Sequence, residues 1–312
     1  MRIIAVHGIG RHADDFRLAW QGKLREQLQD DSAEVVGLRW SDEQDQVADR
    51  FPVASERLQG VMSRIGIGAV ENFRSSAAYD LLHSHIYDLF AYSFLHELRH
   101  YMQTVFLRDL LKLVRGREQD TVIVAHSLGT AMTVHVAALT RRLADTVPVR
   151  GAVLLAPPLG VRSPLESVPD PLAVSPDSSL PTAIHDLDGL TAEEQIRWAA
   201  TRDYGDALDE SARLQLLIDI CNDWPSRRLH FVVNTNDVVC SDVKFELGDT
   251  QRDIISIKQG YSDDEREVID TLQRFHEVSF GRPDLGEVAA NHDAIAYLGT
   301  AAVGAALQEI LS

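Results

Sequence analysis

The chain is poor in the features that mark secreted or membrane-spanning proteins. Only two cysteines occur among 312 residues, Cys221 and Cys240, too few for a disulfide framework. No run reaches the roughly 18 consecutive apolar residues that a membrane-spanning helix needs. Strand-like residues begin at Arg2, which leaves no room for a secretory signal peptide before them. We therefore expect a cytoplasmic protein without an integral membrane segment.

Positive charge is also scarce in this sequence. The chain has 30 Lys and Arg against 47 Asp and Glu, which gives a formal net charge of −17. Nucleic acids and anionic membranes are bound by clustered Lys and Arg, and the sequence contains no basic stripe. The composition thus excludes nucleic acid as an expected partner, and we interpret the acidity as a feature of solubility. It does not predict an oligomeric state.

Strand-like apolar runs alternate with segments of helical periodicity along the chain. This alternation predicts an α/β fold with a mainly parallel sheet flanked by helices. A length of 312 residues with 45% hydrophobic content is sufficient for one large domain. The predicted strands are residues 2–6, 34–40, 121–125, 149–155 and 229–234, with a weaker sixth at 254–258. Helical periodicity covers residues 16–28, 128–143, 267–278 and 293–311.

Two segments are longer than ordinary connections between such elements. Residues 42–120 have the pattern of a helical insertion, rich in aromatic residues from Tyr79 to Phe106. Residues 162–182 contain five prolines among serines and aspartates, which predicts a loop. Both leave from carboxyl ends of predicted strands, the side on which ligands bind in open α/β sheets. One or both segments could form a cap over the site, or both could be peripheral decoration, and the sequence leaves these alternatives open.

The most informative segment is residues 121–130, which read Thr-Val-Ile-Val-Ala-His-Ser-Leu-Gly-Thr. A strand-forming run leads into Ser127, and a helical pattern follows at once. This is the layout of a nucleophile elbow, where the residues two before and two after the serine must be small. Ala125 and Gly129 hold those positions. Ser127 would lie at the positive end of the helix dipole. The alternative is a buried strand followed by an ordinary serine N-cap.

A serine nucleophile needs backbone donors for the oxyanion that forms on the attacked carbonyl. Residues 7–10, His-Gly-Ile-Gly, directly follow the first predicted strand and therefore open at the same sheet edge as Ser127. In the arrangement that accompanies such an elbow, one donor is the N–H after the nucleophile, here Leu128, and the other comes from this loop. We select Ile9, because the flanking glycines let its amide point inward. As a phosphate loop, the segment lacks the further residues that such motifs require.

The orienting acid is expected at the end of a later strand. Asp237 closely follows the predicted strand at 229–234, which places it to reach across the sheet edge toward a histidine. Asp242 is the second candidate, five residues further along the same loop. A local Asx turn is the structural alternative for this segment. We prefer Asp237 as the acid.

The general base is expected to be a histidine near the C-terminal end. His292 directly precedes the last predicted helix. His276 competes with it, but lies within the helical pattern at 267–278. An isolated histidine is commonly structural, yet the chain order serine, aspartate, histidine is the order that accompanies this type of elbow. That order favours His292.

Residues 6–10 and 125–129 resemble the corresponding motifs of small bacterial lipases and esterases of the α/β-hydrolase superfamily, which also carry alanine in place of the first elbow glycine. The resemblance covers the core strands and motif loops. It implies attack on an ester carbonyl, hydrolysis of an acyl-enzyme, a small-molecule acyl substrate and no cofactor. The roles it implies are nucleophile, acid and base for Ser127, Asp237 and His292, and oxyanion amides for Ile9 and Leu128.

The insertion at 42–120 departs from the minimal lipases and leaves the acyl group open. Hydrolysis of a thioester, lactone or amide, or acyl transfer to an alcohol, would use the same residues. A hydrolase fold that only binds a partner is a further alternative. A broken catalytic triad would indicate such a protein, but no triad residue is missing from this sequence. Arg11 and His126 lie near the expected edge and are weaker candidates for substrate binding.

One segment matches a metal motif. Residues 96–100, His-Glu-Leu-Arg-His, fit the H-E-x-x-H pattern of zinc proteases, with His96 and His100 on one helix face. Glu118 would be a third ligand by spacing alone. Arg99 would place a positive charge beside the ion, and the rest of the chain supports serine chemistry. We therefore predict no metal site, and keep a zinc peptidase only as the less favoured alternative.

Overall fold

The computed structural model describes residues 1–8, 16–39, 96–142, 149–157, 217–218, 221–222, 224, 227–237, 240, 243–246, 254–257, 263–282 and 288–312. For residues 96–101, 138–142, 243–246 and 254–257 the description is limited to the backbone. The predicted insertion up to residue 95, the predicted loop at 162–182, and Ile9, Arg11 and Asp242 lie outside the described residues.

Six parallel strands form the central sheet, in the order β2-β1-β3-β4-β5-β8. Their carboxyl ends therefore share one edge, and β3, β4 and β5 are buried along their whole length. Such continuous apolar runs are typical of parallel strands covered on both faces. The strands are β1 (Arg2–Val6), β2 (Glu34–Leu38), β3 (Thr121–His126), β4 (Gly151–Leu155), β5 (Leu229–Asn234) and β8 (Arg274–Val278).

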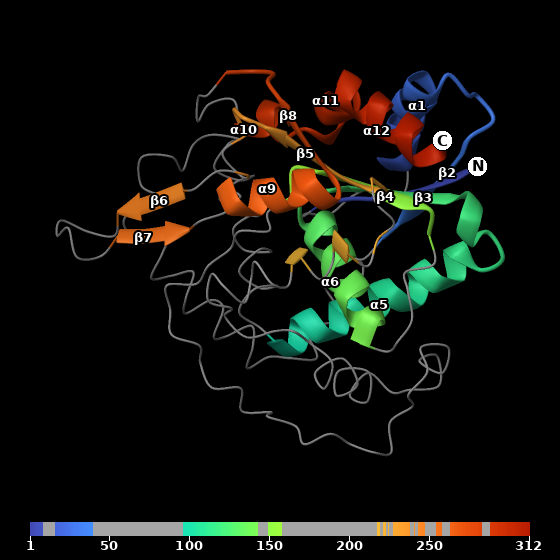
Figure 1. The fold of residues 1–312 in the computed structure, drawn as a ribbon, viewed down its shortest axis with the longest axis horizontal. Helices are drawn as coiled ribbons and strands as arrows, with labels where there is room; N and C mark the ends of the chain where they lie inside the picture. The colour runs from blue at the N-terminus through green and yellow to red at the C-terminus, as the bar shows by residue number, and fades with distance from the viewer. Residues whose placement is uncertain are drawn as a thin grey trace, which may run out of the picture.

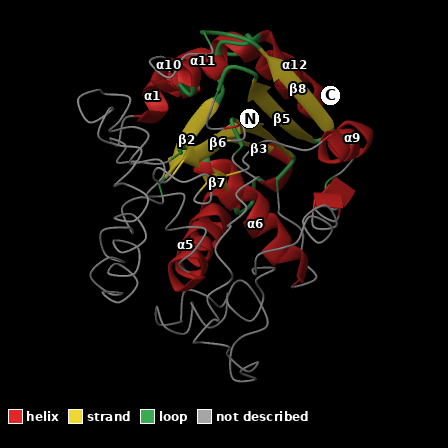
Figure 2. Cartoon of the chain, turned by 90° about the vertical axis from the view of Figure 1, so that its left-hand side faces the viewer, coloured by secondary structure: helices red, strands yellow, loops and turns green. Residues whose placement is uncertain are grey.

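Helices cover both faces of this sheet, as Figures 1 and 2 show. One face carries α5 (His96–Val114) and α6 (Leu128–Arg142), which pack against each other. On the other, α1 (Phe16–Leu28) packs against α11 (Ala294–Leu298) and α12 (Ala301–Leu311). The predicted α/β class, with a mainly parallel sheet between helices, is confirmed.

The prediction of one helix over 267–278 is wrong in its second half. Helix α9 (Asp263–Leu272) ends before Gln273, and the chain continues as edge strand β8 beside β5. The buried side chain of Gln273 fixes this change: its amide donates to Cys221 O at 2.7 Å and accepts the Leu229 N–H at 2.9 Å. Tertiary pairing with β5 thus overrides the local helical periodicity.

The weaker strand predicted at 254–258 is present, but it is not part of the central sheet. It is β7 (Ile254–Ile257), which pairs antiparallel with β6 (Val243–Glu246) in a separate two-stranded sheet. Figure 1 shows this small sheet to one side of the central one. The sixth strand of the central sheet is β8 instead.

The last predicted helix is divided by a break at Gly299 and Thr300 into α11 and α12, and a short helix α10 (Val288–Asn291) precedes them. Asp293 caps α11, because its carboxylate accepts the backbone N–H groups of Ile295 and Ala296. Within the described ranges, no single helix is long and apolar enough to cross a membrane; residues 289–298 and 301–311 meet that test only as a pair bent by 42°.

Gly151 allows close packing where β4 begins, and a methyl group there would test that packing. Its Cβ would lie 2.6 Å from the carbonyl oxygen of Arg228 and 2.7 Å from Cγ2 of Ile310. We expect Gly151→Ala to lower the free energy of unfolding by about 1–3 kcal/mol, because that carbonyl is fixed by its bond to the Ala152 N–H. Urea denaturation followed by circular dichroism measures the change.

The matched control is Gly22, which lies on the exposed face of α1 with open space around its missing side chain. Gly22→Ala should raise the free energy of unfolding by about 1 kcal/mol, because alanine is the better helix former. A Gly151→Ala variant as stable as the wild type would contradict the packing described for β4.

Candidate active site

Ser127 lies in the sharp turn between β3 and α6. Its φ of 54° is in the left-handed region, which is uncommon for a residue other than glycine. The turn is held from both sides. The Ser127 N–H donates to Leu155 O at 2.9 Å, and the Ser127 carbonyl accepts the backbone N–H of Thr130 at 2.8 Å and its hydroxyl at 2.7 Å. The strand, turn and helix predicted around Ser127 are therefore present.

Two glycines let the end of β1 approach this turn. A Cβ on Gly129 would lie 2.5 Å from the carbonyl oxygen of His7, and a Cβ on Gly8 would lie 2.7 Å from the Cβ atom of Ser127. Real Cβ contacts are essentially never this short, so glycine is required at both positions unless the backbone moves. The loop that follows β1 therefore begins in contact with the serine, as the oxyanion prediction requires.

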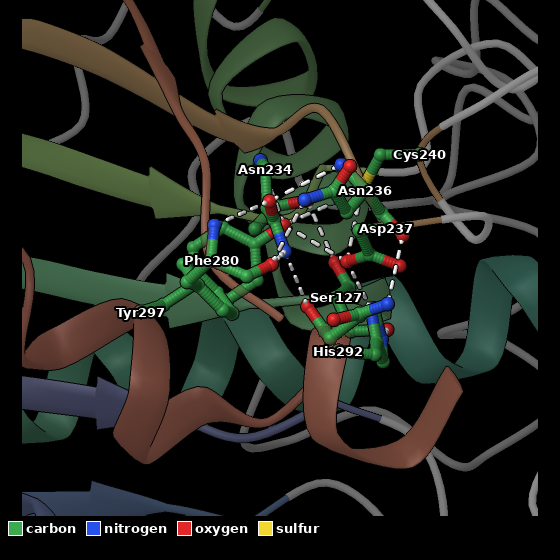
Figure 3. Close-up of polar contacts among 10 residues, drawn as sticks. Ser127, Asn234, Asn236, Asp237, Cys240, Phe280, His292 and Tyr297 are labelled. Carbon is green, nitrogen blue, oxygen red and sulfur yellow. Dashed lines mark hydrogen bonds and ion pairs between the residues drawn. The ribbon is translucent and has the colours of Figure 1, made fainter. Parts of the chain in front are cut away.

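A chain of hydrogen bonds leads from Ser127 into the protein (Figure 3). The Ser127 hydroxyl lies 2.9 Å from Nε2 of His292, whose Nδ1 lies 2.7 Å from Oδ2 of Asp237. These side chains come from the β3–α6 turn, the segment after β5 and the turn between α10 and α11. Ser127 and Asp237 are 0% exposed and His292 is 6% exposed. The structure thus brings together the three residues that the sequence predicted as nucleophile, acid and base.

The geometry also determines which nitrogen of His292 carries the proton. An ionised carboxylate only accepts hydrogen bonds, so Nδ1 donates its hydrogen to Asp237. In the neutral imidazole, Nε2 then carries no hydrogen, and its lone pair faces the Ser127 hydroxyl. This is the tautomer that a general base for Ser127 needs.

Asp237 is held by further hydrogen bonds, through both its backbone and its carboxylate. Its backbone N–H donates to Asn234 O at 3.0 Å at the end of β5. Its Oδ2 also accepts the hydroxyl of Tyr297 at 2.8 Å and the thiol of Cys240 at 3.5 Å. Burial raises the pKa of both the Tyr297 phenol and the Cys240 thiol, and the charge of Asp237 raises them further. Both groups therefore keep their protons and serve as donors.

The sequence interpretation did not identify Tyr297 as part of the site. The available signal was an aromatic residue with a polar tip, five residues after His292 on an otherwise apolar helix. Its partner is 60 residues away in the chain, so only the tertiary structure shows the contact.

Asp237, Cys240 and His292 also form a group with metal-compatible side chains, whose candidate ligand atoms all lie within 4.8 Å of one another. A metal would require a deprotonated thiol and an unprotonated Nδ1. Here the pKa of Cys240 is raised well above its usual range, and Nδ1 donates to Asp237. The chemistry of this group is that of a hydrogen-bonded cluster.

The zinc-protease pattern receives no third ligand from Glu118. His96 and His100 lie near the start of α5, but their side chains are outside the described ones. Glu118 follows the other end of the helix, and the axis between His100 and Val114 alone spans about 21 Å. The Glu118 carboxylate accepts the Gly116 N–H at 2.8 Å, and hydrogen bonds from its own backbone N–H and that of Gly116 lower its pKa. The suggested third ligand is wrong.

Two other predicted residues lie beside Ser127. His126 is buried, and its ring centroid lies 4.7 Å from that of His292 and 5.9 Å from that of Tyr297. Leu128 is the first residue of α6, so its N–H lies outside the helical i→i−4 bonds. A substrate contact by His126 and an oxyanion bond from Leu128 stay predictions.

His276, the competing base, is engaged elsewhere. It lies in β8, where its Nε2 is 3.0 Å from Nδ1 of His230 and the two rings stack at 11° with centroids 5.3 Å apart. Nε2 of His230 is 3.1 Å from the carbonyl oxygen of Arg227 and donates to it. Burial lowers the pKa of both rings, that of His230 to about 4, with His276 as a further cause. Both histidines are therefore neutral at pH 7.

Comparisons with known proteins agree with this geometry. A family model described as serine hydrolase matches residues 99–184, which include Ser127. No curated protein matches the chain. The parallel sheet and the turn at Ser127 have the arrangement of the α/β-hydrolase fold, and the matched part of the chain is similar to serine hydrolases.

Two solved structures also align with the chain at low similarity. One is RedJ with a PEG molecule bound in its active site, at 16% identity and a TM-score of 0.34, covering 96% of this chain and 91% of that one. The other is the RedJ thioesterase from the prodiginine biosynthetic pathway in Streptomyces coelicolor, at 14% identity and a TM-score of 0.35, covering 96% and 85%. At such TM-scores these alignments carry no weight for fold or function.

The stacked histidines predict how stability depends on pH. His230 titrates near 6.5 when unfolded but near 4 when folded, so the unfolded chain binds more protons between these values. The free energy of unfolding should therefore fall as the pH is lowered from about 6.5 to 4, by at most about 3 kcal/mol from this group. Urea titrations at a series of pH values measure this loss.

His230→Gln is the informative variant, because its amide can still donate to the carbonyl of Arg227 but does not titrate. Its stability should fall less steeply over the same pH range than that of the wild type. Equal slopes for both proteins would contradict the assignment of a neutral, buried His230.

Proposed function

We propose that this serine hydrolase cleaves a carboxylic ester of a small-molecule acyl substrate through an acyl-enzyme on Ser127. The observation that carries the proposal is the buried chain from the Ser127 hydroxyl through His292 to Asp237, at 2.9 Å and 2.7 Å. It lies at the carboxyl edge of a parallel sheet, where the ligands of such folds bind.

In the acylation half-reaction, the Ser127 oxygen bonds to the ester carbonyl carbon as Nε2 of His292 takes its proton. The carboxylate of Asp237 stabilises the resulting imidazolium through Nδ1. The negative charge moves to the former carbonyl oxygen, where the amides of Leu128 and Ile9 would donate to it. As the tetrahedral intermediate collapses, the bond to the leaving alcohol breaks and His292 gives that alcohol the proton.

Deacylation repeats the same steps with water as the nucleophile. His292 takes a proton from water as the water oxygen bonds to the acyl carbon, and then returns a proton to the Ser127 oxygen as the acid product leaves. Burial of the three side chains favours these proton transfers, because in a low dielectric the fixed charge of Asp237 acts on His292 with little screening.

A carboxylic ester is proposed as the substrate because the motifs at residues 6–10 and 125–129 resemble those of lipases and esterases. Thioester or amide hydrolysis and acyl transfer would use the same proton transfers and differ in the leaving group or the acceptor. We propose no metal or other cofactor for the reaction.

Covalent labelling tests the nucleophile. A fluorophosphonate probe should label the wild-type protein once, because a serine activated by a neutral histidine attacks the phosphorus atom. Intact-mass spectrometry and peptide mapping should place the label on Ser127. The Ser127→Ala variant should stay unlabelled, whereas Ser32→Ala, which changes an exposed serine before β2, should be labelled like the wild type. Equal labelling of wild type and Ser127→Ala, or of neither, would overturn the proposal.

A matched set of substrates tests the acyl and leaving groups. We expect p-nitrophenyl esters of increasing chain length to be hydrolysed with a kcat/KM that peaks at the length that the acyl pocket accepts. That kcat/KM should fall by at least about 1000-fold in Ser127→Ala. Thioesters and anilides with the same acyl groups form the comparison series. A higher kcat/KM for the thioester than for the ester at every chain length would refute ester specificity while leaving the serine mechanism intact.

A further inference from the structure

We propose that Tyr297 is a positioning residue of this hydrolase, which holds the carboxylate of Asp237 in place and directed at His292. The inference rests on the proposed function. It gives Tyr297 a role beyond packing, because its hydroxyl lies between a backbone donor on β5 and the carboxylate that orients the base (Figure 3).

The direction of the Tyr297 hydrogen bond is fixed by its two neighbours. The backbone N–H of Asn234 donates to the Tyr297 oxygen at 3.0 Å, and an N–H can only donate. The hydroxyl hydrogen is therefore available for the carboxylate of Asp237, 2.8 Å away, which can only accept. Because the pKa of the Tyr297 phenol is raised, this hydrogen stays on Tyr297 at neutral pH.

The same carboxylate oxygen accepts hydrogen bonds from both Tyr297 and His292. Oδ2 of Asp237 accepts the Tyr297 hydroxyl at 2.8 Å and the His292 Nδ1–H at 2.7 Å. With the weaker thiol donor Cys240 at 3.5 Å, these two donors restrict rotation of the carboxyl group more than a single donor would. Hydrogen bonds to the charged form also offset the cost of burying a carboxylate that is 0% exposed.

The spacing between the two donors is set by a single capped turn. Asp293 follows His292 and accepts the N–H groups of Ile295 and Ala296 at the start of α11. The Tyr297 N–H donates to the Asp293 carbonyl at 3.1 Å, which closes the turn. His292 and Tyr297 thus reach Asp237 from one rigid segment.

The Tyr297 ring has a fixed position without its hydroxyl. It is 0% exposed and packs edge-on against Phe280, with centroids 5.0 Å apart at 89°, and against His126 at 5.9 Å. Tyr297→Phe keeps these ring contacts and removes only the oxygen that joins Asn234 to Asp237. The substitution therefore separates the positioning role from the packing role.

The decisive experiment compares Tyr297→Phe with the wild type in p-nitrophenyl ester hydrolysis and in the rate of fluorophosphonate labelling. We expect kcat and the labelling rate to fall about tenfold, with KM changed by less than about twofold, because the lost hydrogen bond supports the base and not substrate binding. The acidic limb of kcat/KM against pH should move to higher pH. With one donor fewer, Oδ2 presents more negative charge to His292 and favours its protonated, inactive form.

Thr121→Val is the matched control, because it also removes one buried hydroxyl, which donates to Arg117 O at 2.7 Å at the opposite end of β3 from Ser127. It should lose stability without a change in the pH profile or in kcat. If Tyr297→Phe matches Thr121→Val in kcat, labelling rate and pH profile, Tyr297 only packs and the inference is wrong.

Two further readouts separate the failure of this inference from that of the proposed function. Labelling of the wild type but not of Ser127→Ala, with an unchanged Tyr297→Phe profile, overturns the role of Tyr297 alone. Labelling of both or neither overturns the serine mechanism, and the role of Tyr297 with it.

The low-field proton resonance of the His292 Nδ1–H should move or broaden in Tyr297→Phe and stay unchanged in Thr121→Val. This resonance reports the positioning of His292 without turnover.

Discussion

At Gly129 the first turn of α6 lies so close to β1 that a single methyl group would be 2.5 Å from the carbonyl of His7. This backbone contact positions the serine turn beside the loop after β1. The parallel sheet positions the other residues of the site. Since all six strands end at one edge, segments from distant parts of the chain meet there.

From that turn inward, the polar groups form one directed series. The Asn234 N–H donates to the hydroxyl of Tyr297, which in turn donates to the carboxylate of Asp237. His292 donates to the same carboxylate through Nδ1, and its Nε2 faces Ser127. The N–H of Asn234 can only donate and the carboxylate of Asp237 can only accept, and these two groups fix the direction of the Tyr297 hydrogen bonds between them. Such networks stabilise a unique arrangement when every member is satisfied, and the cost of an unpaired member is high at 0% exposure.

Much of this arrangement was predictable because its signals are local. Five of the six central strands are short apolar runs, and Ser127, Asp237 and His292 each lie next to a strand or helix boundary in a recognisable order. The edge strand β8 was not predictable, because its residues continue the helical spacing of α9 and only pairing with β5 makes them a strand. Tyr297 was missed for the same physical reason: its polar tip acquires a role only when the fold brings Asp237 to it.

The left-handed backbone of Ser127 has a consequence for how such a protein changes over time. A non-glycine residue in this region carries about 1–3 kcal/mol of conformational strain, which the surrounding hydrogen bonds offset. Glycine would relieve that strain, yet it has no hydroxyl for the proposed chemistry. Selection for a more stable fold and selection for hydrolysis therefore act in opposite directions at this one position. A lineage released from the need for catalysis would be expected to lose its serine here before it lost its sheet.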